Sequence, residues 1–219
     1  MTASTGKQAL EAGARATIDD AAAALRRGGV IVYPTETVYG LGVDASNRKA
    51  LAALLELKGR DAARGMSVLV RDLPMASQLL AAAPSDAALA LATRFWPGPL
   101  TLVLPAAPGL APQLCGAGGG VGLRCSSDPW AAALLESFAA PVTSTSANPA
   151  GAQPARTIEQ AREYFRCGID VFVDGGSRSA SEVSTVVEFL QGRAYLRRIG
   201  AIDAASIASI IDLMEEARG

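Results

Sequence analysis

Histidine is absent from the 219 residues of this chain. Its absence excludes a Ser-His-Asp triad, a Cys-His pair, an HExxH zinc site and a histidine general base. Any catalysis must therefore rely on carboxylates, lysine and arginine, hydroxyl groups, a bound metal ion or the substrates' own reacting groups.

Cysteines and long apolar runs are also scarce. Cys115, Cys125 and Cys167 are odd in number and widely spaced, so we predict reduced structural thiols and neither a disulfide framework nor a CxxC metal site. No apolar run approaches the roughly 18 residues that a membrane-spanning helix needs. Residues 1–16 lack the apolar core of a signal peptide. We therefore expect a cytoplasmic protein without membrane contact.

Neither sign of charge is in clear excess. The chain has 20 Lys and Arg against 21 Asp and Glu, a formal net charge of −1, which gives no global attraction for nucleic acid. A local basic concavity is still compatible with this balance, because acids elsewhere can offset it. With half its residues hydrophobic and 19% charged, the composition is that of an ordinary globular protein.

Helical and strand-like patterns alternate along the chain without an internal repeat or a linker. This alternation predicts one α/β domain with a mixed parallel and antiparallel sheet over residues 17–219, after a flexible segment over 1–16. Parallel crossovers are expected early and antiparallel pairing late, where little chain separates the strands. Helices are predicted from a cap at Thr17 to Arg27, over 47–57, 73–82, 85–95 and 128–138, from a cap at Thr157, and over 203–216. Strands are predicted over 30–33, 67–70, 100–104, 121–125, 142–145, 169–173, 184–190 and 195–198, with loops over 35–44 and 116–120.

Two short segments far apart in the sequence are the main candidates for chemistry. Lys58-Gly59-Arg60 places two cations just past a predicted helix end, and Ser144-Thr145-Ser146-Ala147-Asn148 offers hydroxyls and an amide with little bulk. If the fold brings them together, they form a site for a triphosphate. Each also has an ordinary structural explanation, because cations are favoured at a helix C-terminus and such polar clusters favour turns.

Other polar residues lie at the borders of apolar strands. Thr35, Thr37 and Tyr39 follow the predicted strand 30–33, where function often sits in α/β folds. Arg124 closes another apolar strand, so its charge must reach the surface, an ion pair or an anionic ligand. Ser184, Thr185 and Arg198 occupy similar positions later in the chain. No Walker-type or GxGxxG motif accompanies them.

Taken in order, these residues carry a family resemblance. The segments that carry it are Tyr33 to Gly42, Lys58-x-Arg60, Phe95 to Thr101, Val121-Gly122-Leu123-Arg124 and Ser144 to Gly151. The chain resembles the YrdC family of threonylcarbamoyl-AMP synthases from about Thr17 to Ile202, in the family's short single-domain form. Two positions depart from the pattern, because Val183 and Asp61 stand where the family usually has proline.

The resemblance implies a twisted mixed sheet with flanking helices around a concave basic cavity. It implies that L-threonine, bicarbonate and ATP, with Mg2+, give threonylcarbamoyl-AMP and pyrophosphate, the first step of the tRNA modification threonylcarbamoyladenosine. Transferase proteins acting on tRNA would be downstream partners, and direct contact with tRNA or double-stranded RNA would be a further one. The implied ATP site contains Lys58, Arg60, Ser146, Asn148 and Arg198, with Lys58 and Arg60 catalytic. The implied threonine site contains Thr35, Arg124, Ser144 and Thr185.

Three other hypotheses stay open at this point. The chain could be a non-catalytic module for double-stranded RNA or tRNA, although no aromatic residue is interleaved with a basic run. It could be a carbamoyl-transfer module, which would normally need partner domains. It could also be an α/β domain whose hydroxyls merely lie on the surface.

Overall fold

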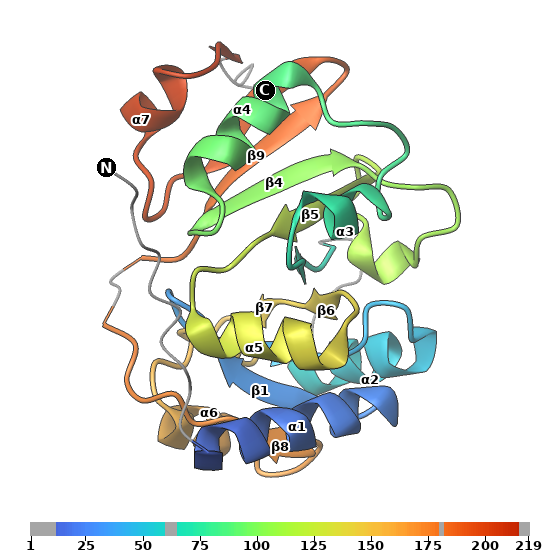
Figure 1. Cartoon of the computed structure of the whole chain (residues 1–219), viewed down its shortest axis with the longest axis vertical. Coiled ribbons are helices and arrows are strands. Elements are labelled where there is room, and N and C mark those ends of the chain that lie inside the picture. Colours follow the sequence, from blue (N-terminus) through green and yellow to red (C-terminus); the bar gives the residue numbers. More distant parts are fainter. Residues whose placement is uncertain (1–11, 60–64, 180–181, 215–219) are drawn as a thin grey trace.

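The computed structural model describes residues 12–59, 65–179 and 182–214 (Figure 1). Its helices are α1 (Ala12–Arg26), α2 (Arg48–Lys58), α3 (Leu73–Ser77), α4 (Asp86–Phe95), the 3-10 helix η1 (Pro112–Leu114), α5 (Pro129–Phe138), α6 (Ile158–Tyr164) and α7 (Ala204–Ala208). Its strands are β1 (Ile31–Pro34), β2 (Tyr39–Gly42), β3 (Val68–Leu69), β4 (Leu100–Pro105), β5 (Gly120–Arg124), β6 (Val142–Thr143), β7 (Thr145–Ser146), β8 (Val171–Phe172), β9 (Thr185–Leu190), β10 (Arg193–Arg198) and β11 (Leu213–Met214).

The strands form two mixed sheets. One has the order β7-β2-β1-β8, and the other has the order β11-β10-β9-β4-β5-β3-β6. In Figure 1 the first sheet lies in the lower half with α1, α2, α5 and α6, while β4 and β9 lie in the upper half with α4. The predicted α/β domain with mixed pairing is confirmed. The late antiparallel pair is also confirmed, as β9 with β10.

Strand β1 shows why helices cover both faces of the smaller sheet. Its side chains alternate in direction, as a strand requires. Ile31 and Tyr33 pack into one apolar cluster with α1 and α5, whereas Val32 packs into the other with α2 and α6. All four residues of the strand are buried, as in a central strand covered on both faces.

Several helices begin where their caps predict. Asn47 and Asp128 each accept two backbone N–H groups at the starts of α2 and α5, and Ser85 and Thr157 each accept one at α4 and α6. These four helices match the predicted positions. In the described part of the chain, no helix combines the length and apolar character needed to cross a bilayer.

The expected start of the first helix is wrong. Helix α1 begins at Ala12, and Thr17 lies inside it, with its hydroxyl donating to the carbonyl of Gly13 at 3.1 Å. The alanine-rich stretch before Thr17 favours helix strongly enough to extend it upstream. Residues 12–16 of the predicted flexible segment are therefore helical, and residues 1–11 lie outside the described part.

The predicted loop over 35–44 is also wrong, because it contains β2. Strand β2 pairs antiparallel with β1 through a hairpin, so pairing early in the chain is not parallel there. Its glycines are needed for packing, since a Cβ atom at Gly42 would lie 2.7 Å from the Tyr33 ring. The glycines at 40 and 42 favour a loop, which outweighed the alternation of Tyr39 and Leu41 in the prediction.

Two predicted helices are shorter than expected. Helix α3 ends at Ser77, and within the described residues 203–214 of the second predicted helix only Ala204–Ala208 is helical. Leu213 and Met214 form β11 instead, paired parallel with β10. Pairing with a neighbouring strand here outweighs the local helical spacing.

The predicted strand 142–145 divides between the two sheets. Thr143 pairs with β3 of the larger sheet, and Thr145 pairs with β2 of the smaller one. Ser144 lies at the crossing, where its backbone N–H donates to the carbonyl of Ser67 at 2.6 Å. The polar segment 144–148 therefore begins where the two sheets meet.

Candidate active site

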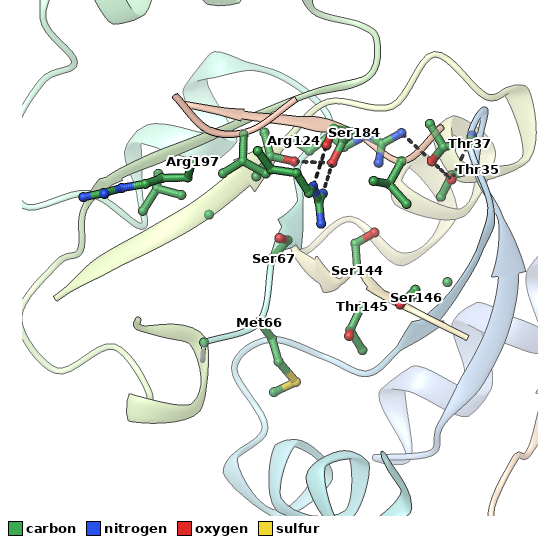
Figure 2. A pocket seen from close by; sticks show the side chains of 18 of the residues that line it. Thr35, Thr37, Met66, Ser67, Arg124, Ser144, Thr145, Ser146, Ser184 and Arg197 are labelled. Carbon is green, nitrogen blue, oxygen red and sulfur yellow. Dashed lines mark hydrogen bonds between the residues drawn. The ribbon is translucent and has the colours of Figure 1, made fainter. Parts of the chain in front are cut away.

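A cavity of about 380 Å³ lies between the two sheets. The β1–β2 hairpin and β7 form one wall, and β4, β5, β9 and β10 form the other (Figure 2). Hydroxyl groups, glycines and three arginines line it. The polar lining residues are Thr35, Thr37, Tyr39, Ser67, Thr101, Arg124, Ser144, Thr145, Ser146, Ser184, Glu188, Arg197 and Arg198. Such a wall suits an anionic ligand that also forms many hydrogen bonds.

Arg124 is the buried cation of this cavity. It ends β5, is 6% exposed, and places Nη2 3.0 Å from Oε1 of Glu36. The same Nη2 donates to Oγ1 of Thr37 at 3.0 Å. Its Nε is buried and has no hydrogen-bond partner among the described residues. The sequence predicted that Arg124 reaches the surface, an ion pair or an anionic ligand. In the structure Arg124 forms an ion pair and also lies on the wall of a cavity.

The hydroxyls of Thr35 and Thr37 lie side by side but differ in the hydrogen bonds that they can still accept. Thr35 donates its single hydroxyl hydrogen to the carbonyl of Val38 at 2.7 Å. Thr35 has no second hydrogen to give to Thr37, 3.0 Å away, and its oxygen also accepts from the backbone N–H groups of Thr37 and Val38, both at 3.3 Å. Thr37 in turn accepts from Arg124, which leaves one Thr37 lone pair for a donor in the cavity. Thr37 is therefore better placed than Thr35 to accept a hydrogen bond from a ligand.

The opposite wall has its own arginine and hydroxyls. Arg198 donates from Nε to the carbonyl and from Nη2 to the hydroxyl of Ser184, both at 2.9 Å. The Ser184 hydroxyl lies 3.0 Å from Oγ1 of Thr101. Figure 2 shows Arg197 at the end of the view away from Thr35 and Thr37. Arg197 donates from Nε to Glu188 at 2.6 Å.

Thr185, predicted to contact threonine, lies just behind this wall. It is 0% exposed, and its hydroxyl donates to the carbonyl of Ile202 and accepts from the backbone N–H groups of Gly200 and Ile202. One donated and two accepted bonds use the full capacity of a hydroxyl. Gly200 approaches so closely that a Cβ atom would lie 2.2 Å from the carbonyl of Val183. Thr185 thus holds the wall, and the lining hydroxyl is that of Ser184.

The structure brings Lys58 to the segment 144–148. Lys58 is the last residue of α2 and is 4% exposed. Its Nζ donates to the carbonyl of Asn148 at 2.9 Å and to that of Ser146 through a shorter contact. The ammonium group therefore fixes the loop that carries Ser146, which itself lines the cavity.

The remaining predicted site residues divide into three groups. Thr35, Arg124, Ser144, Ser146 and Arg198 line the cavity. Asn148 is 8% exposed and donates to the carbonyls of Pro149 and Ala152, while its Oδ1 is buried without a partner among the described residues. Arg60 lies outside the described residues.

Sequence reasoning left several lining residues out of the candidate site. Thr37 and Ser184 carried a signal, because each lies near one end of an apolar strand and within two residues of a chosen residue. Ser67, Thr101 and Arg197 carried none, since they face the cavity only through the pairing of β3, β4 and β10 with their neighbours.

A cavity between two sheets, with arginines and hydroxyls on its walls, is typical of an α/β protein with a site for a polar, anionic ligand. The family of this chain follows from comparison with known proteins. The chain belongs to the Sua5/YciO/YrdC family, whose model, described as "Telomere recombination", matches residues 23–200.

Two curated relatives have high coverage. The threonylcarbamoyl-AMP synthase of Halorhodospira halophila is 39% identical over 81% of this chain and 92% of its own length. The threonylcarbamoyl-AMP synthase of Thiobacillus denitrificans is 43% identical over 77% of this chain and 89% of its own.

Solved structures agree with the fold. The crystal structure of P. abyssi Sua5 complexed with L-threonine superposes with a TM-score of 0.86 at 31% identity. The match covers 93% of this chain and 59% of that longer chain. E. coli YciO matches with a TM-score of 0.79 at 25% identity, over 88% of this chain and 93% of its own.

Proposed function

We propose that this chain is a threonylcarbamoyl-AMP synthase, which makes L-threonylcarbamoyl-AMP and pyrophosphate from L-threonine, bicarbonate and ATP. The observation that carries the proposal is Arg124, a buried guanidinium on the cavity wall whose Nε has no partner among the described residues. A guanidinium group with a free N–H suits the carboxylate of an amino acid. The names of the relatives, and the threonine complex of P. abyssi Sua5, support the same ligand.

The proposed chemistry needs no histidine. The amine of threonine attacks CO2 formed from bicarbonate and loses a proton, giving an N-carboxylate. One oxygen of that carboxylate forms a bond to the α-phosphorus of ATP, and the bond to the bridging oxygen breaks, so that pyrophosphate leaves. The attacking group is already anionic, so this step requires positioning and charge stabilisation and no strong base.

We assign the two ends of the cavity to two substrates. The end with Arg124 and Thr37 takes threonine, since it offers a guanidinium donor for a carboxylate and a hydroxyl lone pair for an ammonium group. The end with Arg197 and Arg198 takes the phosphates of ATP, because these cations can offset their charge. Ser146, Arg60 and Asn148 stay predicted members of the ATP site, and Lys58 acts on that site through the loop that carries Ser146.

Mg2+ would enter with ATP. Among the described residues, no three His, Cys, Asp or Glu side chains are grouped to hold a metal ion. This arrangement fits Mg2+, which commonly keeps several waters and binds through substrate phosphates and at most one or two carboxylates. Glu188, on the cavity wall beside Arg197, is the carboxylate that would bind this Mg2+.

The product would be consumed by proteins that transfer the threonylcarbamoyl group to tRNA. The cytoplasmic location and any direct contact with tRNA or double-stranded RNA stay predictions. The formal net charge of −1 weighs against RNA binding as the main activity.

A substrate-omission assay tests the proposal. The purified chain is incubated with ATP, Mg2+, bicarbonate and L-threonine, and pyrophosphate release is followed with each component left out in turn. We expect release to need both threonine and bicarbonate. Pyrophosphate release without threonine would exclude the proposed reaction. Salt-sensitive binding of tRNA in place of turnover would favour the RNA-binding alternative.

A further inference from the structure

Arg178 donates hydrogen bonds to four different residues near the threonine end of the cavity. Its Nη1 donates to Oδ2 of Asp128 at 2.6 Å and to the carbonyl of Thr35 at 3.3 Å. Its Nε donates to the carbonyl of Gly176 at 3.2 Å, and its Nη2 donates to that of Gly175. The side chain is only 13% exposed. Such a planar fork of donors has no equivalent in lysine, whose three N–H groups share one nitrogen.

Two of the groups that Arg178 contacts belong to the cavity wall. Thr35 and Tyr39 both line the cavity, and the guanidinium lies over the Tyr39 ring, 5.8 Å from its centre. Tyr39 strengthens the same junction, because its hydroxyl donates to the carbonyl of Gly176 at 2.8 Å and accepts from the N–H of Gly175 at 3.1 Å. Arg178 and Tyr39 therefore clamp the segment after β8 against the start of β2.

Asp128 provides the counter-charge. Its Oδ1 accepts from the N–H groups of Trp130 and Ala131 and so caps α5, while Oδ2 accepts from Arg178. Burial raises the pKa of Asp128 above its ordinary value, and the nearby charge of Arg178 opposes that rise. Without Arg178, the carboxylate would lie buried without its partner cation.

We propose that Arg178 is a positioning residue for the threonine end of the cavity. By holding the carbonyl of Thr35, it fixes the turn from Thr35 to Val38, on which Thr37 is placed to face both Arg124 and the ligand. The role rests on the proposed function. Arg178 is not among the described residues that line the cavity, so it acts through Thr35 and is not a catalytic residue.

The test compares apparent KM values for two substrates in the full chain. In Arg178→Gln we expect the KM for L-threonine to rise about tenfold, corresponding to ~1.4 kcal/mol, with the KM for ATP changed less than twofold. Arg178→Lys should behave similarly, because it keeps the charge and loses the fork. The matched control is Arg162→Gln, which removes an exposed arginine that lies over the Phe172 ring. Equal rises in both KM values, or an unchanged KM for threonine, would overturn the proposal.

A double variant separates positioning from simple charge balance. Asp128→Asn keeps the oxygen that caps α5 and removes the buried charge, so Arg178→Gln with Asp128→Asn should recover thermal stability. If Arg178 only balances Asp128, the KM for threonine should return to normal as well. If Arg178 positions Thr35, that KM should stay raised. If the unaltered chain turns over threonine and these variants keep a normal KM for threonine, only the inference on Arg178 is wrong. If the unaltered chain shows no threonine-dependent turnover, the proposed function itself is wrong.

Discussion

Arg124 carries its charge where water is almost excluded, at 6% exposure. Glu36 balances that charge, and Thr37 takes one of its donors. The sequence could identify this position, since an arginine at the end of an apolar strand needs a partner. It could not identify the partner, because Glu36 lies in the turn of the β1–β2 hairpin, far away in sequence, and comes near Arg124 only where the two sheets meet.

Replacing Arg124 with lysine should weaken threonine binding while leaving Glu36 with a partner cation. We expect the dissociation constant for L-threonine to rise about a hundredfold, or ~2.7 kcal/mol, because lysine lacks the directed N–H of Nε. Calorimetric titration measures this directly. Arg94→Lys, on the exposed side of α4, is the control. An unchanged dissociation constant for Arg124→Lys would remove Arg124 from the threonine site.

Lys58→Ala should lower pyrophosphate release on the order of a hundredfold while the fold survives. The loss follows from releasing the carbonyls of Ser146 and Asn148, since displacements of about 1 Å cost that much in rate. Steady-state rates with circular dichroism distinguish loss of activity from loss of fold. Lys49→Ala, an exposed change on the same helix, should keep the normal rate. Near-normal turnover in Lys58→Ala would remove Lys58 from the mechanism.

The cysteines should differ in reactivity, since the described structure leaves all three as free thiols. Burial raises the pKa of Cys125 to about 11 and also raises that of Cys115, whereas Cys167 is exposed. A thiol reacts as its thiolate, so at pH 8 the Cys125 thiol stays protonated. We expect an aromatic disulfide reagent to modify Cys167 first and Cys125 only after unfolding. Fast reaction of Cys125 in the folded chain would contradict its buried position.

At the scale of elements, helices with side-chain caps could be predicted and strands made by pairing could not. Asn47, Ser85 and Asp128 mark their helices because the cap is a local interaction. Strands β2 and β11 were not predicted, because pairing with a neighbouring strand outweighs the glycines of β2 and the helical spacing around β11. The segment 142–145 was predicted as one strand, because its division between two sheets at Ser144 also depends on pairing with distant strands.

The wall that carries Ser184 depends on the close passage of Gly200. A Cβ atom there would meet the Val183 carbonyl at 2.2 Å and the Ser184 carbonyl carbon at 2.7 Å, so the backbone must move. We expect Gly200→Ala to destabilise the fold by about 3 kcal/mol, lowering Tm by about 5–10 °C, and to reduce turnover. Scanning calorimetry with a rate assay measures both. Gly13→Ala has open space around it in α1 and should leave Tm unchanged or raise it, whereas equal behaviour of the two variants would contradict the packing described.

At the scale of the whole molecule, two sheets place residues from distant parts of the chain around one cavity. Thr35 and Ser146 come from the smaller sheet side, and Arg124, Ser184 and Arg198 come from the larger. The order of motifs along the chain indicated which residues belong together, through the family resemblance. That order did not indicate which hydroxyls face the cavity, because Thr185 and Ser184 are adjacent in sequence and only Ser184 lines it.

The identity of the product tests the proposed reaction most directly. The purified chain is incubated with ATP, Mg2+, L-threonine and ¹³C-labelled bicarbonate, and the nucleotides are analysed at once by mass spectrometry. We predict an adenylate that contains both threonine and the labelled carbon, formed together with pyrophosphate. A threonine adenylate without the labelled carbon, or no threonine-containing adenylate at all, would exclude this reaction.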